Sequence, residues 1–172
     1  MTTAHASTVD TPVGPFTVLV DGDGAVLASG WTADLHALLP QVAPALRPTE
    51  PQWGADLGAV TAAVSAYHRG ELSAIDAIAV RQRSGPFLQQ AWDVLRGVPA
   101  GAPVSYTELA AKAGRPEAVR AAAAACARNA AALFVPCHRV LRNDGSLGGF
   151  RWGTTVKRWL LEHEAPGAPR RF

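Results

Sequence analysis

Cys137 and His138 are adjacent in the stretch Val135–Val140, which reads Val-Pro-Cys-His-Arg-Val. A thiol beside an imidazole can be held as the thiolate, the form that attacks carbon. An isolated cysteine more often serves only in packing. We interpret Cys137 as a reactive nucleophile, because a proline constrains the backbone ahead of it and the segments around it could position it.

Helices with clear boundary signals precede this stretch. A Gly-Pro pair predicts the start of a helix over residues 85–96. Ser105 and Glu108 have the spacing of a capping box, which predicts a helix over residues 106–113. A proline in the first turn predicts another helix, over residues 116–128. Two short helices joined by a turn that contains glycine are typical of a helix-turn-helix.

The second helix of this pair is almost pure alanine, with Arg120 near its start and Arg128 at its end. A helix face without side-chain bulk lets the backbone approach a DNA duplex closely. The alternative is an alanine-rich helix that packs tightly inside the protein, and composition alone does not separate the two.

The segments on either side of Cys137 predict a short strand before it, and a loop and a last helix after it. Residues 133–135 ahead of the cysteine predict a short buried strand. Residues 142–149 are rich in Gly and turn residues and predict a mobile loop, which continues into the aromatic segment 150–153. Apolar spacing predicts a helix over Val156–Glu164.

The first half of the chain predicts a small sheet with one helix. Residues 1–10 are expected to form a flexible tail. Residues 16–20 and 25–31, joined by an Asp-Gly turn, predict a β-hairpin. Helical spacing of apolar residues predicts a helix over residues 57–69, and a third strand is predicted over Leu72–Val80.

We therefore predict an α+β fold with two domains. Residues 1–84 form a scaffold domain of a small sheet and a helix, and residues 85–172 form a mainly helical domain with the helix-turn-helix. The first domain supplies neither a nucleophile nor a cluster of metal ligands, so the chemistry is expected in the second.

The two halves differ in charge. Residues 1–84 carry four Arg against eight acidic residues, a net charge of −4, whereas residues 85–172 carry twelve Lys and Arg against six, a net charge of +6. This asymmetry indicates that the second half meets a polyanion.

The cysteine usage and the N-terminus bear on the compartment. Two cysteines, a polar N-terminus without a secretory signal, and the lack of a membrane-spanning apolar run favour the cytoplasm. The sequence suggests no role for Cys126.

Residues 87–164 resemble the O6-alkylguanine-DNA alkyltransferases, DNA repair proteins that are consumed in their own reaction. The matching elements keep the family's order and nearly its spacing: Val104-Ser105-Tyr106, Arg120-Ala121, Asn129, Pro136–Val140, Gly149–Gly153 and Val156–Glu164. The first half matches only loosely, through residues 12–15 and the following hairpin.

The resemblance implies direct and irreversible transfer of an alkyl group, mainly methyl, to Cys137. The donor would be O6 of guanine, and also O4 of thymine, in double-stranded DNA. It further implies a single turnover, no cofactor, no metal and a monomer.

The resemblance also implies a proton relay. The thiolate of Cys137 would form through a water bonded to His138, whose ring a carboxylate orients. Glu164 lies three and four residues after Leu161 and Leu160, on the face expected to be buried, so we assign it this role in preference to Glu162.

A base inside a duplex cannot meet a buried thiol, so the resemblance implies that the base is flipped out. Arg120 would fill the vacated space, Tyr106 would rotate the 3′ phosphate and hydrogen-bond guanine N3, and Asn129 would brace the helix against the cysteine turn. The residues expected to contact DNA are Tyr106, Arg120, Ala121, Ala122 and Arg128.

The pocket for the base would be lined by Val140 and Phe150, with backbone carbonyls near Cys137 receiving the exocyclic amine. Arg151 and Trp152 depart from family members that carry small residues at these positions. Their bulk predicts a narrow pocket that accepts methyl more readily than benzyl.

Other functions would use the same residues differently. A cysteine hydrolase would need Cys137 and His138, but not an Ala-rich helix flanked by Arg. A metal site has no ligand spacing of known type, and the zinc site of some family members is absent because no cysteine precedes Cys126. A sensor of the alkyltransferase-like kind binds alkylated DNA without repairing it, but such proteins replace the acceptor cysteine.

Overall fold

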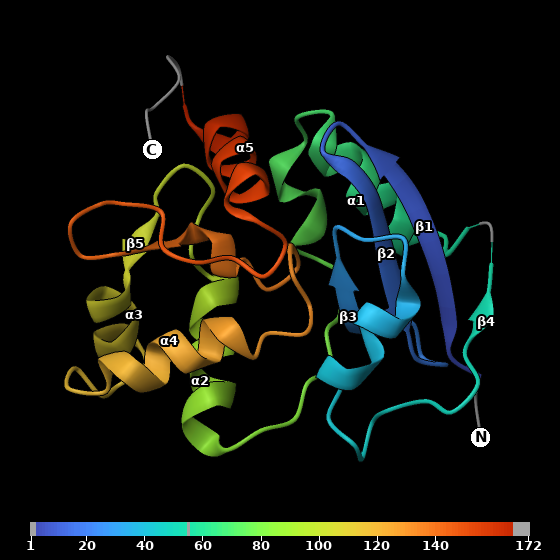
Figure 1. Cartoon of the computed structure of the whole chain (residues 1–172), viewed down its shortest axis with the longest axis horizontal. Coiled ribbons are helices and arrows are strands. Elements are labelled where there is room, and N and C mark those ends of the chain that lie inside the picture. The colour runs from blue at the N-terminus through green and yellow to red at the C-terminus, as the bar shows by residue number, and fades with distance from the viewer. Residues whose placement is uncertain (1–2, 55, 167–172) are drawn as a thin grey trace. The chain divides into compact units, whose positions relative to one another are not determined.

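The computed structural model describes residues 3–54 and 56–166 and has the predicted α+β architecture (Figure 1). Its internal contacts divide the chain into two units. One contains the residues up to Arg83 together with Ala130–Phe134, and the other contains Ser84–Asn129 and the residues from Val135 onward. The short segment Ala130–Phe134 thus belongs to the first unit, although it lies in the second half of the sequence.

The first unit is built on a four-stranded sheet in the order β3-β2-β1-β4. β1 (His5–Thr11) and β3 (Val26–Gly30) both pair antiparallel with β2 (Gly14–Val20), and the two-residue β4 (Gln52–Trp53) pairs parallel with β1. The predicted Asp-Gly turn joins β2 to β3, with Gly24 at φ 84°, a conformation that glycine adopts without strain.

The prediction that residues 1–10 form a flexible tail is wrong for those that the structure describes. β1 begins at His5 and is paired with β2 along its whole length. Ala6 is fully buried, and the hydroxyls of Thr8 and Thr17 lie 2.8 Å apart across the strands. A polar segment with few apolar residues is a weak strand signal by itself, and the cross-strand pairs with β2 supply the stabilisation.

The predicted strand over Leu72–Val80 is also wrong. Leu72–Ile75 forms a 3-10 helix that packs against α1 (Ala59–His68), and Val80 makes an isolated bridge to β3. The first part of this run packs against a helix, and only its end at Val80 joins the sheet, a difference that the apolar pattern of the sequence does not reveal.

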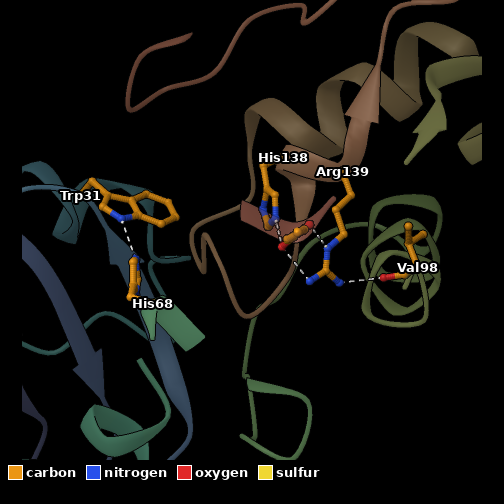
Figure 2. Close-up of polar contacts among 6 residues, drawn as sticks. Trp31, His68, Val98, His138 and Arg139 are labelled. Carbon is orange, nitrogen blue, oxygen red and sulfur yellow. Dashed lines mark hydrogen bonds and ion pairs between the residues drawn. The ribbon is translucent and has the colours of Figure 1, made fainter. Parts of the chain in front are cut away.

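An aromatic cluster fills the core of the first unit. The rings of Phe16 and Trp31 meet edge to face, with centroids 4.9 Å apart. Trp31 Nε1 donates to His68 Nε2 at 3.4 Å (Figure 2), and His68 Nδ1 lies 2.7 Å from the carbonyl oxygen of Val64. These contacts suit a neutral imidazole that carries its proton on Nδ1, which explains how a histidine is accommodated in this core.

The second unit is mainly helical, as predicted. α2 (Pro86–Arg96), α3 (Tyr106–Lys112) and α4 (Val119–Ala127) pack against one another, and α5 (Thr154–Glu164) follows the long loop. The capping box is present: the Ser105 hydroxyl accepts from the Glu108 N–H at 3.0 Å, and the Glu108 carboxylate accepts from the Ser105 N–H at 3.1 Å.

A short parallel pairing that the sequence did not predict lies beside these helices. β5 (Val104–Ser105) pairs with β6 (Val140–Leu141). β5 leads directly into α3, and β6 directly follows the turn that carries Cys137. The pairing therefore holds Tyr106, the first residue of α3, close to the strand that follows the cysteine.

Two local predictions in this half are corrected. α4 begins at Val119 rather than at Pro116, because Ala118 has a non-helical backbone (φ −90°, ψ 47°) and the preceding residues form a turn. Residues 133–135 are not a strand. Leu133 has a positive φ of 79°, so the chain turns there instead of extending.

Candidate active site

The Cys137 turn is a single 3-10 turn, Cys137–Arg139, that follows Pro136. The Cys137 N–H donates to the Val135 carbonyl at 2.8 Å, and the Arg139 N–H donates to the Pro136 carbonyl at 2.9 Å. The cysteine is buried, with 8% of its surface exposed. A tight turn stabilised by its own backbone hydrogen bonds fixes the direction of the thiol.

Asn129 connects the end of α4 to this turn. Its side-chain amide donates to the Val135 carbonyl at 2.8 Å and to the Cys137 sulfur at 3.3 Å. Burial raises the pKa of the Cys137 thiol, and the hydrogen bond from Asn129 and the charge of Lys157 act in the opposite direction. The resting sulfur is therefore a protonated thiol whose anionic form already has a hydrogen-bond donor.

His138 is fully buried next to the cysteine, and its Nε2 lies 2.8 Å from Oε2 of Glu164 (Figure 2). Burial lowers the pKa of His138, although Glu164 opposes this effect. Among the described residues, none provides a hydrogen-bond partner for His138 Nδ1, which is also buried. A neutral imidazole with its proton on Nε2 leaves Nδ1 able to accept a proton.

Glu164 lies at the end of α5 and is 3% exposed. Burial by itself would raise the pKa of its carboxyl, but the contacts with His138 and Arg139 outweigh burial and hold the pKa well below its usual range. The carboxylate is ionised at neutral pH, and it can orient the imidazole of His138.

Two buried cations at this site were not assigned a role from the sequence. Arg139 donates from Nε and NH2 to the two oxygens of Glu164, both at 2.9 Å, and from NH1 to the Val98 carbonyl at 2.7 Å. Lys157 is fully buried and donates from Nζ to the carbonyls of Val140, at 2.8 Å, and Gly149, at 3.4 Å.

A sequence signal for Lys157 did exist. Positions 157, 160, 161 and 164 lie on one face of α5, so the spacing that selected Glu164 also predicts a buried lysine. Arg139 had a weaker signal, because it is a charged residue within a mostly apolar stretch, residues 130–141. Its partner Val98 lies 41 residues away in the sequence.

Tyr106 begins α3, and burial raises its pKa to about 12. Its hydroxyl is a protonated hydrogen-bond donor at neutral pH. A Cβ placed on Gly148 would lie 3.3 Å from this hydroxyl, and Gly148 has a φ of 71°. A glycine is therefore needed where the loop passes over Tyr106.

The residues predicted to contact DNA do not all face solvent. Arg120 and Arg128 are exposed, and Ala121 is half-buried. Ala122 is fully buried on the inner face of α4, so its side chain is not available to DNA. The alanine-rich composition thus fits both interpretations at once, since Ala122 and Ala125 pack inward while Arg120 and its exposed neighbours lie outward.

The predicted pocket residues lie on the strand and loop after the Cys137 turn. Val140 is fully buried, whereas Phe150 and Trp152 are half-buried. Arg151 is exposed, and its guanidinium donates to the carbonyl of Ala127 at the end of α4. A cation there satisfies one of the carbonyls that a helix leaves without a partner at its C-terminus, so this side chain joins the loop to α4.

In the part of the chain that the structure describes, no three His, Cys, Asp or Glu side chains lie together as a metal site would require. Within the same residues, no helix is both long enough and apolar enough to cross a membrane.

Known proteins resemble this chain in sequence and structure. Residues 86–166 match the family model described as the DNA-binding domain of 6-O-methylguanine DNA methyltransferase. The bifunctional transcriptional activator/DNA repair enzyme Ada of Escherichia coli is 51% identical over 88 residues, which are 51% of this chain and 25% of Ada. The chain therefore matches about a quarter of that protein's length.

Other relatives match nearly the whole chain. The methylated-DNA–protein-cysteine methyltransferase of Mycobacterium bovis is 37% identical over 168 residues, which are 96% of this chain and 94% of the relative. A crystal structure of the Mycobacterium tuberculosis O6-methylguanine methyltransferase superposes with a TM-score of 0.76 at 31% identity, covering 96% of this chain and 96% of that one. A crystal structure of M. tuberculosis OGT in complex with DNA superposes with a TM-score of 0.72 at 28% identity, covering 93% of this chain and 92% of that one. From the full-length match, together with the resemblance already visible in the sequence, it follows that the chain belongs to the methylated-DNA–protein-cysteine methyltransferase family.

Proposed function

We propose that this protein repairs DNA by transferring an alkyl group, mainly methyl, from O6 of guanine, and also from O4 of thymine, to Cys137. The observation that carries the proposal is a buried thiol that accepts a hydrogen bond from Asn129 and directly precedes a buried His138–Glu164 pair. This arrangement has the parts that activate a nucleophilic thiol: an adjacent base and a carboxylate that orients the base.

The proposed reaction is a displacement at the alkyl carbon. The Cys137 sulfur forms a bond to that carbon while the bond from carbon to O6 of guanine breaks, and the bonding electrons remain on the guanine. The thiol proton passes through a bridging water to Nδ1 of His138, and the guanine anion finally takes up one proton to give ordinary guanine. Because burial favours the protonated thiol at rest, the base is needed to generate the nucleophile.

We assign to Tyr106 the role of a hydrogen-bond donor to guanine N3 as the O6 bond breaks. Its raised pKa of about 12 keeps the phenol protonated at neutral pH, which supports this assignment. A donor placed where negative charge develops in the transition state accelerates the reaction. The thioether formed on Cys137 has no route back to the thiol in this scheme, so each molecule acts once.

Double-stranded DNA is the proposed partner. The second half of the chain has a net charge of +6 and matches a DNA-binding domain model, and the M. tuberculosis relative has been crystallised with DNA. We propose that the exposed Arg120 enters the base stack and fills the space left by a flipped base, while Arg128 contacts phosphate.

The test of the proposed function is the intact mass of the protein after incubation with a duplex that contains one O6-methylguanine. We expect a gain of one methyl group per protein molecule, located on Cys137 by peptide mapping, and no further turnover when more substrate is added. Binding of the duplex without a mass change would instead support an alkylated-DNA sensor. Multiple turnovers with release of methanol would support a hydrolase.

Arg120→Ala should slow repair of duplex DNA by roughly tenfold or more, since extruding a paired base costs a few kcal/mol that the inserted side chain helps to offset. Transfer from the free base O6-methylguanine, which needs no extrusion, should change little. The measurement is the second-order transfer rate on both substrates, with Arg158→Gln on α5 as a control for loss of one positive charge. Equal losses on the duplex and on the free base would show that Arg120 does not act in extrusion.

We propose that the Trp152 indole narrows the space beyond O6, so that a larger alkyl group requires the loop to open. Trp152→Gly should therefore increase the rate of transfer from O6-benzylguanine by about tenfold. The rate for O6-methylguanine should change much less. Both rates are measured for the wild-type protein and the variant, at equal folded fraction. A wild-type protein that accepts benzyl as fast as methyl would show that Trp152 does not limit the pocket.

A further inference from the structure

We propose that Arg139 is a positioning residue for the transfer: it fixes the Glu164 carboxylate and offsets its charge, so that His138 remains a neutral base next to Cys137. The inference rests on the proposed function, in which His138 takes the thiol proton. It adds a fourth member to the relay of cysteine, histidine and glutamate.

The contacts of Arg139 have the geometry of a two-point clamp. Its Nε and NH2 each lie 2.9 Å from a different oxygen of Glu164 (Figure 2). The Arg139 residue is almost fully buried. NH1 lies 2.7 Å from the Val98 carbonyl, which holds the other end of the guanidinium. A planar guanidinium bonded at three points fixes the plane of the carboxylate, which a lysine ammonium cannot do.

His138 shares this carboxylate with Arg139. Glu164 Oε2 accepts from both His138 Nε2, at 2.8 Å, and Arg139 NH2, at 2.9 Å. Rotation of the carboxylate would therefore break the contact that orients the imidazole. Arg139 thus acts on the reacting thiol indirectly, through Glu164 and then His138.

The charged groups that face His138 also influence whether its imidazole is protonated. Glu164 and Lys157 face it from α5, and Arg139 follows it in the same turn. A buried glutamate alone would favour the protonated imidazolium, which cannot accept the thiol proton. Two buried cations oppose that preference, and Arg139 is the one that is directly paired with the carboxylate.

A purely structural role would explain the same contacts, since Arg139 also links α5 to the residue Val98 that follows α2. The two roles differ in their dependence on pH. A structural link changes the amount of folded protein, whereas a positioning role also changes the pH at which the folded protein begins to react.

The test compares Arg139→Gln, which removes the cation and the clamp, with Arg139→Lys, which retains the cation but loses the clamp. Methylation of Cys137 is followed by intact mass as a function of pH on a duplex containing O6-methylguanine, with rates normalised to the folded fraction from circular dichroism. Arg158→Gln, on the exposed side of α5, is the control for removal of one arginine charge.

For Arg139→Gln we expect the acid limb of the rate profile to move upward by about one pH unit, and the rate at neutral pH to fall about tenfold. For Arg139→Lys we expect slower transfer with the acid limb unmoved. A Gln variant with the wild-type acid limb overturns the proposal. If the Gln variant does not fold, the Lys variant decides: a wild-type rate overturns the proposal, and slower transfer at an unchanged limb supports it. Failure of the wild-type protein to gain a methyl group would overturn the proposed function itself.

Discussion

Replacing Cys137 by Ser or Ala should abolish alkyl transfer while leaving DNA binding within a few-fold of the wild-type value. A serine hydroxyl is a much weaker nucleophile than a thiol, and alanine has none, so no covalent product can form at this position. The turn that carries residue 137 is held by backbone hydrogen bonds, which both substitutions retain. The measurements are intact mass after incubation with alkylated duplex, and the dissociation constant at fixed salt concentration.

Cys126→Ser is the matched control, because Cys126 is the other cysteine of the chain and also has a free thiol. Burial raises the pKa of both thiols, but Cys126 precedes Ala127 rather than a histidine, so it lacks the adjacent base that we propose activates Cys137. The Cys126 variant should gain one methyl group like the wild-type protein. A methyl group on the Cys137 variants, or none on the Cys126 variant, would move the acceptor role away from Cys137.

Glu164→Gln should lower the free energy of unfolding by about 3 kcal/mol and also slow transfer strongly. The substitution leaves the buried guanidinium of Arg139 without its counter-charge, which is the costly way to break a buried ion pair. It also removes the carboxylate that orients His138. The measurements are chemical denaturation and the transfer rate of the fraction that remains folded. Glu162→Gln, exposed on the same helix, should change neither by much.

Protonation of the Glu164 carboxyl should make the protein less stable at low pH. Its pKa in the folded protein is lowered, so the stabilisation is fully present above the ordinary pKa of glutamate and is lost as the pH falls through the lower, folded-state value. The wild-type protein should lose stability as the pH falls below about 4, and Glu164→Gln should lose less over the same range. Identical slopes for the two proteins would show that Glu164 is not the group responsible.

Much of the site could be predicted because its signals are local. The adjacency of Cys137 and His138 needs no tertiary information. The capping box at Ser105 depends only on residues three positions apart and is formed as predicted. The burial of Glu164 followed from its spacing to Leu160 and Leu161 on α5, since helical geometry places such residues on one face.

Other features depended on partners that are distant in the sequence. β1 carries a weak strand signal and becomes a strand because β2 pairs with it. Leu72–Val80 has the apolar residues of a strand, but its first part, Leu72–Ile75, is a 3-10 helix that packs against α1. The start of α4 was misplaced because a proline can stand either in a first helical turn or in the turn before the helix, and only the backbone at Ala118 separates the two.

What the sequence determined by itself was therefore the family, the adjacency of Cys137 and His138, and the helices whose faces and caps lie within a few residues. What only the tertiary structure decided was which charges meet. Arg139 meets Glu164 and the Val98 carbonyl across 25 and 41 residues, and Lys157 meets the carbonyls of Val140 and Gly149. Periodicity shows that a charged residue is turned inward. The partner that compensates the cost of burying it is set by how separate elements pack, and no spacing along the chain specifies that partner.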